Sequence, residues 1–343
     1  MRLIRVERDA QGATLRTTDG NMHVSFRTPD IARIRYTLDE EFSGKESLMI
    51  AERPERAEVK WSLTEDDDGV ELATESIKIR VDKSTCAFSY WDREGRLLTK
   101  EPSSGGKTLE RIDVIRTIFD GSAEVETNQS ADGLRARAEG VRHVVDRQAY
   151  HTKLEFEWQP GEALYGLGSH EEGMMNLRGK VQYLYQQNMK AVIPVLVSTR
   201  GYGVLVDSYS LMIFRDDAFG SYIWTDVDDE MDYYFIYGPS LDRIVHGVRY
   251  LTGDAPMLPR WAFGYVQSKE RYTSQEELIG IVREYRRRGL PIDCIVLDWM
   301  SWPDGLWGQK TLDPARFPDP KGMMERLHAM NAKLMVSIWP IMN

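Results

Sequence analysis

Apolar and polar residues alternate one by one along much of the first two thirds of the chain. Residues 22–26, 77–81 and 154–158 follow this pattern, with apolar side chains at every second position. A period of two places those side chains on one face of a strand, as in half-buried antiparallel sheets. Many short strands separated by polar turns predict a β-sandwich over residues 1–240. We expect turns at 92–95, 103–106, 128–133 and 200–201.

Near residue 240 the pattern changes to helices that alternate with short apolar runs. Ser240, Ser274 and Asp319 can each cap a helix, because apolar residues recur behind them at helical spacing. Strand, helix, strand, helix, strand is the sequence form of right-handed βαβ units, so it predicts a parallel sheet. We expect its strands at 262–266, 292–297 and 334–338.

Three parallel strands are too few for a closed barrel, since a (β/α)8 barrel needs roughly 250 residues. The final segment is therefore either an open α/β unit or the opening of a longer barrel. Apolar strands left unpaired at an open edge favour aggregation. We therefore expect residues 241–343 to be a fragment, or one segment, of a larger fold.

Composition and charge narrow the class of protein. The chain has 343 residues, of which 42% are hydrophobic and 29% are charged. These values are ordinary for a soluble globular protein, and the length is sufficient for two domains. The formal net charge of -10 argues against nucleic acid as a partner, since phosphate binding needs clustered basic residues. No stretch approaches the roughly 18 apolar residues of a membrane span. The first residues lack the apolar segment of a signal peptide, so we expect a cytoplasmic protein.

Polar and aromatic residues follow each of the three predicted parallel strands, at 267–272, 298–302 and 339–340. In barrels, side chains at the carboxyl ends of the strands form the active site. A carboxylate accepts paired hydroxyl donors and an indole stacks on a pyranose ring, so Asp298 and its neighbouring tryptophans suit a sugar. The alternative is structural, with Asp298 as a cap of the following loop and the tryptophans as core residues.

No motif indicates a cofactor or a metal. Gly166-Leu167-Gly168 lacks the third glycine of a dinucleotide fingerprint, and Asp66-Asp67-Asp68-Gly69 lacks the distal Glu of a calcium loop. The six histidines show no metal-ligand spacing. The acidic segment 226–230 is interpreted as an exposed loop, and the methionines of 323–330 as core residues. We therefore expect neither a cofactor nor a metal ion.

Several motifs of the chain resemble those of family-31 glycoside hydrolases. In the predicted barrel they are Leu258-Pro259-Arg260-Trp261-Ala262-Phe263-Gly264-Tyr265, Gln267-Ser268-Lys269-Glu270-Arg271-Tyr272, Leu290-Pro291-Ile292-Asp293, Asp298-Trp299, Arg316-Phe317-Pro318-Asp319-Pro320-Lys321-Gly322-Met323 and Ser337-Ile338-Trp339-Pro340. In the predicted sandwich they are Leu164-Tyr165-Gly166-Leu167-Gly168, Gln187-Asn188 and Ser198-Thr199-Arg200-Gly201-Tyr202-Gly203. The resemblance runs from about residue 154 to the end, and the β-rich start is compatible with it.

The resemblance implies a galactose-mutarotase-like β-sandwich followed by a (β/α)8 barrel, an α/β (TIM) barrel of which residues 241–343 would be the first strands and helices. It further implies hydrolysis of terminal non-reducing α-glycosides with retention of configuration. In this family's pattern Asp298 binds sugar hydroxyls in the −1 subsite, Met300 lines that subsite and Trp339 forms its wall. The candidate substrate-binding residues are Asp298, Met300, Trp302, Trp339, Glu270 and Asn188, the last in a sandwich loop that we expect to approach the barrel mouth.

The stretch Asp298-Trp299-Met300-Ser301-Trp302 is closer to the family's α-xylosidase branch than to its α-glucosidases. Retaining hydrolysis needs a nucleophile and an acid/base, and the family places both on strands after the third. We therefore assign no catalytic residue and expect this chain alone to be inactive. An oligosaccharide or small glycoside is the expected partner, and a homo-oligomer is left open. The alternatives are a non-catalytic carbohydrate-binding module and an inactive truncated fragment.

Overall fold

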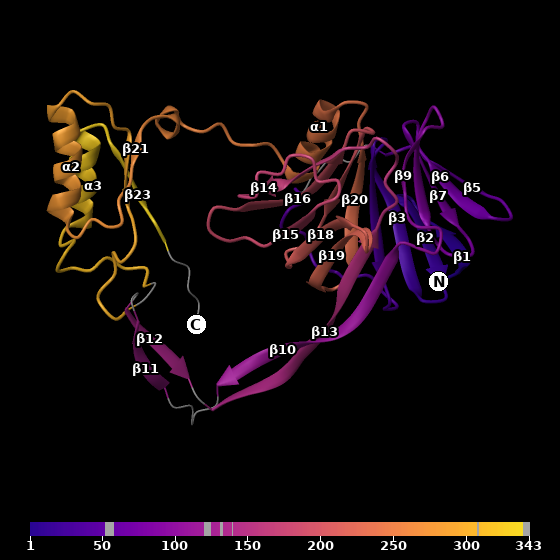
Figure 1. Cartoon of the computed structure of the whole chain (residues 1–343), viewed down its shortest axis with the longest axis horizontal. Coiled ribbons are helices and arrows are strands. Elements are labelled where there is room, and N and C mark those ends of the chain that lie inside the picture. Colours follow the sequence, from indigo (N-terminus) through magenta and orange to yellow (C-terminus); the bar gives the residue numbers. More distant parts are fainter. Residues whose placement is uncertain (52–57, 120–124, 131–132, 139, 307–308, 339–343) are drawn as a thin grey trace. The chain divides into compact units, whose positions relative to one another are not determined.

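The computed structural model describes residues 1–343 apart from 52–57, 120–124, 131–132, 139, 307–308 and 339–343. The chain forms two compact units (Figure 1). The first unit comprises Met1–Arg116 and Val145–Ala255, and the second comprises Thr117–Val144 and Pro256–Asn343. None of the helices within the described ranges is long and apolar enough to cross a membrane.

The largest sheet of the first unit is antiparallel and has eight strands in the order β1-β2-β3-β4-β20-β17-β16-β14. The strand β20 pairs with β4, so the last strand of the unit lies beside one of its first. The bounds are β1 Leu3–Arg8, β2 Gly12–Thr17, β3 Gly20–Thr28, β4 Ile31–Thr37, β14 Leu164–Ser169, β16 Ala191–Ser198, β17 Tyr202–Val206 and β20 Met231–Tyr237. The pairing of β16 with β17 confirms the turn predicted at 200–201.

Two five-stranded sheets complete the unit. One has the order β10-β13-β19-β18-β15, with β10 Lys107–Phe119, β13 Val141–Glu155, β15 Val181–Leu184, β18 Met212–Asp217 and β19 Gly220–Asp228. The other has the order β5-β6-β7-β8-β9, with β5 Ser62–Glu65, β6 Gly69–Ala73, β7 Ile77–Asp82, β8 Phe88–Asp92 and β9 Leu97–Lys100. The hairpin between β8 and β9 confirms the turn predicted at 92–95.

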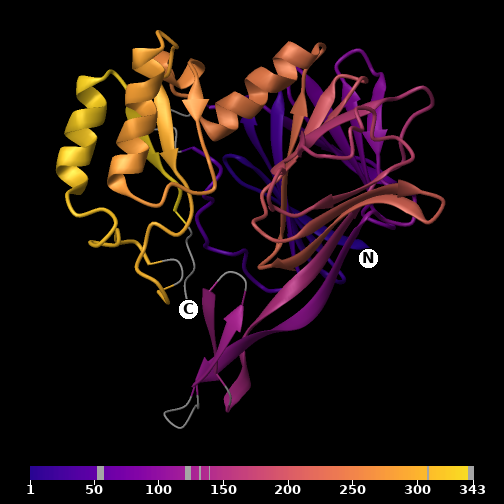
Figure 2. The ribbon, with the colours of Figure 1, turned by 60° about the vertical axis from the view of Figure 1, so that its left-hand side comes forward.

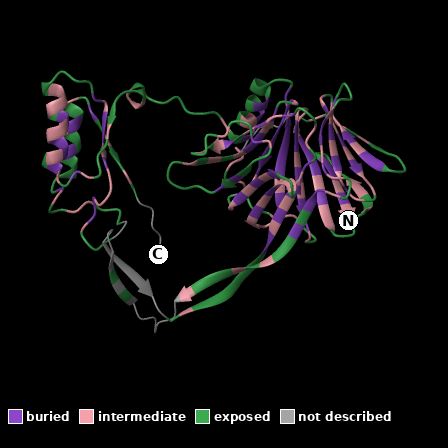
Figure 3. Ribbon diagram, in the orientation of Figure 1, coloured by how far each residue is buried: buried purple, intermediate pink, exposed green. Residues whose placement is uncertain are grey.

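One predicted turn, at 128–133, is wrong over most of its length. Residues 128–130 belong to β11 (Val125–Ser130), which pairs with β12 (Gly133–Ala138). Asn128, Gln129 and Ser130 are common in turns, but cross-strand pairing overrides that local preference here. The strands β10 and β13, which flank this hairpin in the sequence, are largely exposed where they leave the first unit (Figure 3).

The period-two pattern accounts for the core of the first unit. Alternate residues of β3 and β7 are buried, and the rings of Tyr90 and Phe235 stack with centroids 4.1 Å apart.

The core also holds an ion pair, in which Lys107 Nζ lies 2.5 Å from Glu101 Oε1 with both side chains almost fully buried. Burial raises the pKa of Glu101 and lowers that of Lys107. Removal of either side chain would destabilise the fold, because the remaining charge would stay buried without a partner.

The helix α1 (Leu241–Thr252) packs on the sandwich. Its N-cap, Ser240, accepts a hydrogen bond from the backbone N–H of Arg243. Ile244 and Leu251 are buried in a cluster with residues of β17 and β20. The first compact unit therefore continues to Ala255, whereas the boundary drawn from the sequence lay after residue 240.

The second unit contains a parallel sheet of three strands, with β22 between β21 and β23. Its elements are η1 Arg260–Phe263, β21 Val266–Gln267, α2 Gln275–Arg287, β22 Cys294–Leu297, α3 Pro320–Ala329 and β23 Lys333–Val336. Figure 2 shows α2 and α3 side by side against the sheet, and they bury Leu278, Val282, Met323 and Leu327. The parallel pairing confirms the prediction made from the alternation of strands and helices.

The first parallel strand is shorter than predicted. Arg260–Phe263 forms a short 3-10 helix directly after Pro259. The strand predicted at 262–266 overlaps this helix. The Asp293 carboxylate accepts a hydrogen bond from the backbone N–H of Tyr265 at 3.0 Å and lies against Gly264, where a Cβ would meet it at 2.1 Å. Only Val266 and Gln267 pair with β22.

Candidate functional site

The carboxyl end of β22 leads directly into Asp298, the central candidate from the sequence. Asp298 is half-buried, and its carboxylate makes no hydrogen bond or ion pair with any residue that the structure describes. The alternative role as a cap for the following loop thus has no hydrogen bond to support it among the described residues. Carboxylates that lie partly buried without a partner are uncommon, because the desolvated charge is not compensated. The position therefore suits a ligand that brings its own donors.

The two residues after Asp298 have left-handed backbone conformations, with φ of 42° at Trp299 and 44° at Met300. Each costs roughly 1–3 kcal/mol for a non-glycine residue, and such conformations persist only where surrounding contacts fix them. We name residues 298–302 the Asp298 turn. Its last two residues, Ser301 and Trp302, are buried.

Contacts on both sides fix the Asp298 turn. Before it, the backbone N–H of Ser337 donates to the Leu297 carbonyl at 3.0 Å. After it, the backbone N–H of Asp313 donates to the Ser301 carbonyl at 2.8 Å. Arg316 Nη2 donates to the Trp302 carbonyl at 2.5 Å, and Arg316 Nε donates to Asp313 Oδ2 at 2.7 Å. The hydrogen bond from Arg316 also lowers the pKa of Asp313, which keeps that carboxylate charged.

The other candidates at this edge of the sheet differ in accessibility. Glu270 lies exposed in the loop after β21, which neighbours β22, and Met300 is half-buried. Trp302 is only 3% exposed, so its indole presents no face to a sugar in this structure, and its burial favours the core alternative. Trp339, which follows β23, lies outside the residues that the structure describes. The parallel pairing brings the carboxyl ends of β21, β22 and β23 to one edge of the sheet.

Asn188 belongs to the first unit, in an exposed loop between β15 and β16. The side chain of Gln186 shapes this loop: its amide nitrogen donates to the Lys190 carbonyl at 2.6 Å, and its oxygen accepts from the backbone N–H of Val192 at 2.9 Å. Met189 has a left-handed φ of 64°, which turns the chain beside Asn188. That this loop approaches the barrel mouth stays a prediction.

Sequence reasoning did not assign a role to Asp313 and Arg316. Arg316 belongs to one of the family motifs, but the motif gave no role to its side chain. No sequence pattern pointed to Asp313. Their spacing of three residues was the available clue, since it lets an arginine reach back to a carboxylate in one turn of chain. Within the Asp298 turn they bind the backbone carbonyls of Ser301 and Trp302, and a sequence pattern does not indicate which backbone carbonyls accept hydrogen bonds.

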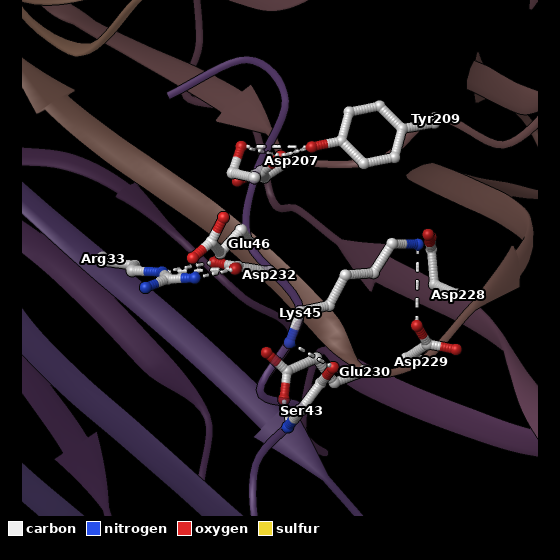
Figure 4. A pocket seen from close by; sticks show the side chains of 11 residues that line it. Arg33, Ser43, Lys45, Glu46, Asp207, Tyr209, Asp228, Asp229, Glu230 and Asp232 are labelled. Atoms are coloured by element: carbon white, nitrogen blue, oxygen red, sulfur yellow. Dashed lines mark hydrogen bonds and ion pairs between the residues drawn. The ribbon is translucent and has the colours of Figure 1, made fainter. Parts of the chain in front are cut away.

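A concave region lies on the first unit (Figure 4). Asp228, Asp229 and Glu230 line it, so 226–230 is not the exposed loop that the sequence suggested. Glu230 is buried and accepts from Arg35 Nε at 2.5 Å, and Asp232 pairs with Arg33 at 2.5 Å. Burial raises the pKa of Asp228 to about 7. The lining residues are Arg33, Ser43, Lys45, Glu46, Ser47, Asp207, Tyr209, Asp228, Asp229, Glu230 and Asp232. No group suited to a metal ion occurs within the described part of the chain.

Each unit contains a match to a known family model. Residues 255–343 match the Glycosyl hydrolases family 31 TIM-barrel domain. Residues 21–214 match the Glycosyl hydrolase 31 N-terminal galactose mutarotase-like domain. The chain belongs to glycosyl hydrolase family 31. The fold expected for family 31, a galactose-mutarotase-like domain followed by the start of a TIM barrel, is thereby confirmed.

Family 31 relatives extend beyond the span of this chain. An α-xylosidase of Saccharolobus solfataricus is 33% identical over 329 residues, which are 93% of this chain and 40% of that protein. The structure of a family 31 α-xylosidase from a soil metagenome, complexed with xylose, is similar with a TM-score of 0.77 and 26% identity, over 99% of this chain and 48% of that one. The family 31 α-xylosidase of Xanthomonas citri gives a TM-score of 0.78 with 23% identity, over 97% and 50%. The chain thus spans half or less of each.

Proposed function

We propose that the protein to which this chain belongs hydrolyses terminal non-reducing α-glycosides, with α-xylosides or α-glucosides as substrates. The single observation that carries the proposal is Asp298, a half-buried carboxylate at the end of the central parallel strand, with no partner among the described residues. Membership of family 31 supports the reaction class. The similarity to α-xylosidases and the stretch 298–302 favour a xyloside.

Asp298 acts in this proposal by binding the sugar rather than by attacking it. A carboxylate accepts charge-assisted hydrogen bonds from two neighbouring hydroxyls, and each is stronger than a neutral hydrogen bond. Such contacts tighten when the ring distorts toward an oxocarbenium-like transition state. Contacts that are stronger in the transition state than in the bound substrate accelerate the reaction. Asp298 would therefore contribute to kcat as well as to binding.

The two catalytic carboxyls are proposed to come from barrel strands that follow β23. A retaining glycosidase needs a nucleophile and an acid/base whose carboxyls lie about 5–5.5 Å apart. Asp298 serves neither role in this proposal, because it is assigned to the sugar hydroxyls. Glu270 and Met300, at the ends of β21 and β22, are proposed to line the same subsite, with Trp339 after β23. Asn188 is proposed to join them from the sandwich.

The test compares substrates and stereochemistry in the full-length protein. Initial rates are measured on 4-nitrophenyl α-xyloside, the matching α-glucoside and the β-xyloside as control. Proton NMR during the first turnovers identifies the anomer released, and the α-anomer demonstrates retention. Cleavage of neither α-glycoside, together with measurable sugar binding, would contradict hydrolysis and favour the carbohydrate-binding alternative. A cytoplasmic location stays a prediction, and the oligomeric state stays open.

A further inference from the structure

The Asp298 turn is a strained segment held by contacts at both ends. Two consecutive left-handed residues, Trp299 and Met300, separate Asp298 from the buried Ser301. Left-handed backbone costs L-residues energy because Cβ approaches the following carbonyl oxygen. Without contacts that hold its ends, the turn would relax to ordinary φ values and move the Asp298 carboxylate. The contacts therefore hold the backbone that carries the Asp298 side chain.

The contacts on the carboxyl side come from one pair of residues. Asp313 donates its backbone N–H to Ser301, while its side chain accepts from Arg316 and from the backbone N–H of Ala315. Arg316 donates along two directions of its guanidinium, to Asp313 and to the Trp302 carbonyl. The side chains of Arg316 and Asp313 are 19% and 15% exposed, so water screens the pair only partly.

The pair is itself fixed to the helical layer of the unit. The carbonyl of Arg316 accepts from the backbone N–H of Gln275 at the start of α2 at 2.9 Å. The side chain of Gln275 is buried and accepts from the backbone N–H of Asp319, which caps α3, at 3.0 Å. Phe317, beside Arg316, is buried in the core of the unit. The loop from Asp313 to Phe317 is thus a rigid support rather than a free surface turn.

We propose that Arg316 and Asp313 are positioning residues that hold the Asp298 turn and so aim the Asp298 carboxylate at the sugar. The inference rests on the proposed function for its catalytic consequence. Neither residue touches the substrate in this account, because both act through the backbone of Ser301 and Trp302. Lysine cannot replace Arg316, since a single ammonium lacks the planar fork that donates in two fixed directions.

The experiment uses three variants of the full-length enzyme. Arg316→Ala removes the support, and Arg316→Lys keeps the charge but loses the fork. Arg326→Ala is the matched control: Arg326 makes a two-pronged pair with Glu276 between α3 and α2, at 2.5 and 2.9 Å, and makes none of the contacts described for the Asp298 turn. Each variant is measured for melting temperature, kcat and KM on 4-nitrophenyl α-xyloside and α-glucoside. Arg316→Lys keeps the test informative if Arg316→Ala does not fold.

Misplacement of a substrate-binding group by about 1 Å costs on the order of 10²-fold in rate. We therefore expect Arg316→Ala to lower kcat/KM by about 10- to 100-fold, with most of the loss in kcat, and Arg316→Lys by at least about fivefold. Arg326→Ala should stay within about twofold of wild type. A folded Arg316→Ala enzyme with kcat/KM within about twofold of wild type would overturn the proposal.

A coupling measurement separates positioning from a general loss of structure. In an Asp298→Ala background the carboxylate that the turn positions is absent, so Arg316→Lys should cost less than about twofold there. An equal loss in both backgrounds would show that Arg316 acts independently of Asp298 and would refute the inference.

Hydrogen exchange of residues 297–303 supplies a readout that does not depend on activity. Exchange there should rise in Arg316→Lys and stay unchanged in Arg326→Ala, because only the first variant loses the support of the turn. If the wild-type protein cleaves neither glycoside but its Arg316→Lys variant shows this rise, the proposed function fails while the structural role stands. Unchanged exchange together with normal kcat/KM overturns the positioning role itself.

Discussion

Replacement of Asp298 by alanine in the full-length enzyme separates sugar binding from structural support. The Asp298 carboxylate has no hydrogen-bond partner among the described residues, so its removal leaves no described group unsatisfied. We therefore expect the free energy of unfolding to change by no more than about 0.5 kcal/mol. Two lost hydrogen bonds to a charged group cost about 1.5–3 kcal/mol each. At about 1.4 kcal/mol per tenfold, kcat/KM should fall by roughly 10²- to 10⁴-fold.

The assay measures kcat/KM and the melting temperature on the same preparation. Asp319→Ala provides the contrasting control, because Asp319 is a true helix cap whose Oδ1 accepts from the backbone N–H of Gly322 at 2.9 Å. Loss of that cap should lower stability by about 1 kcal/mol and leave kcat/KM within about twofold of wild type. The two aspartates should thus show opposite signatures in the same unit.

One outcome would refute the reasoning about Asp298. An Asp298→Ala protein with normal kcat/KM would exclude the binding role, whatever its stability. If that protein were also less stable, as expected for Asp319→Ala, the role of Asp298 would be structural.

Two further predictions concern the first unit. Lys107→Met should lower the free energy of unfolding by about 3–5 kcal/mol in urea titrations, because Glu101 stays buried without its cation, whereas Lys100→Met at an exposed pair should change it by under about 1 kcal/mol; equal effects would contradict this. Asp228 has an ordinary pKa of 3.8, raised to about 7 by burial, so the folded state binds the proton more tightly and loses stability as pH rises between these values. Asp228→Asn should raise the melting temperature at pH 8 but not at pH 4, and an equal shift at both would be inconsistent with that titration.

Much of the fold, and the position of Asp298 within it, were predictable from sequence because they depend on local pattern. Period-two alternation in 22–26 and 77–81 gives strands with one buried face, and helical spacing behind Ser274 gives α2. The apolar run of β22 ends at Leu297, which places Asp298 at the carboxyl end of a parallel strand. Spacing and strand direction suffice for these conclusions, since neighbours in the chain determine them.

Only the tertiary structure decided what holds the site and what is buried in it. The sequence could not show that Arg316 binds the carbonyl of Trp302, that the Trp302 indole is buried, or that β20 lies beside β4. Nor could it show that Glu230, in a run of acidic residues, is buried against Arg35, far away in the chain. Each of these depends on which distant segments meet, and the free energy of those contacts, through burial and hydrogen bonds to backbone groups, is not encoded in local pattern.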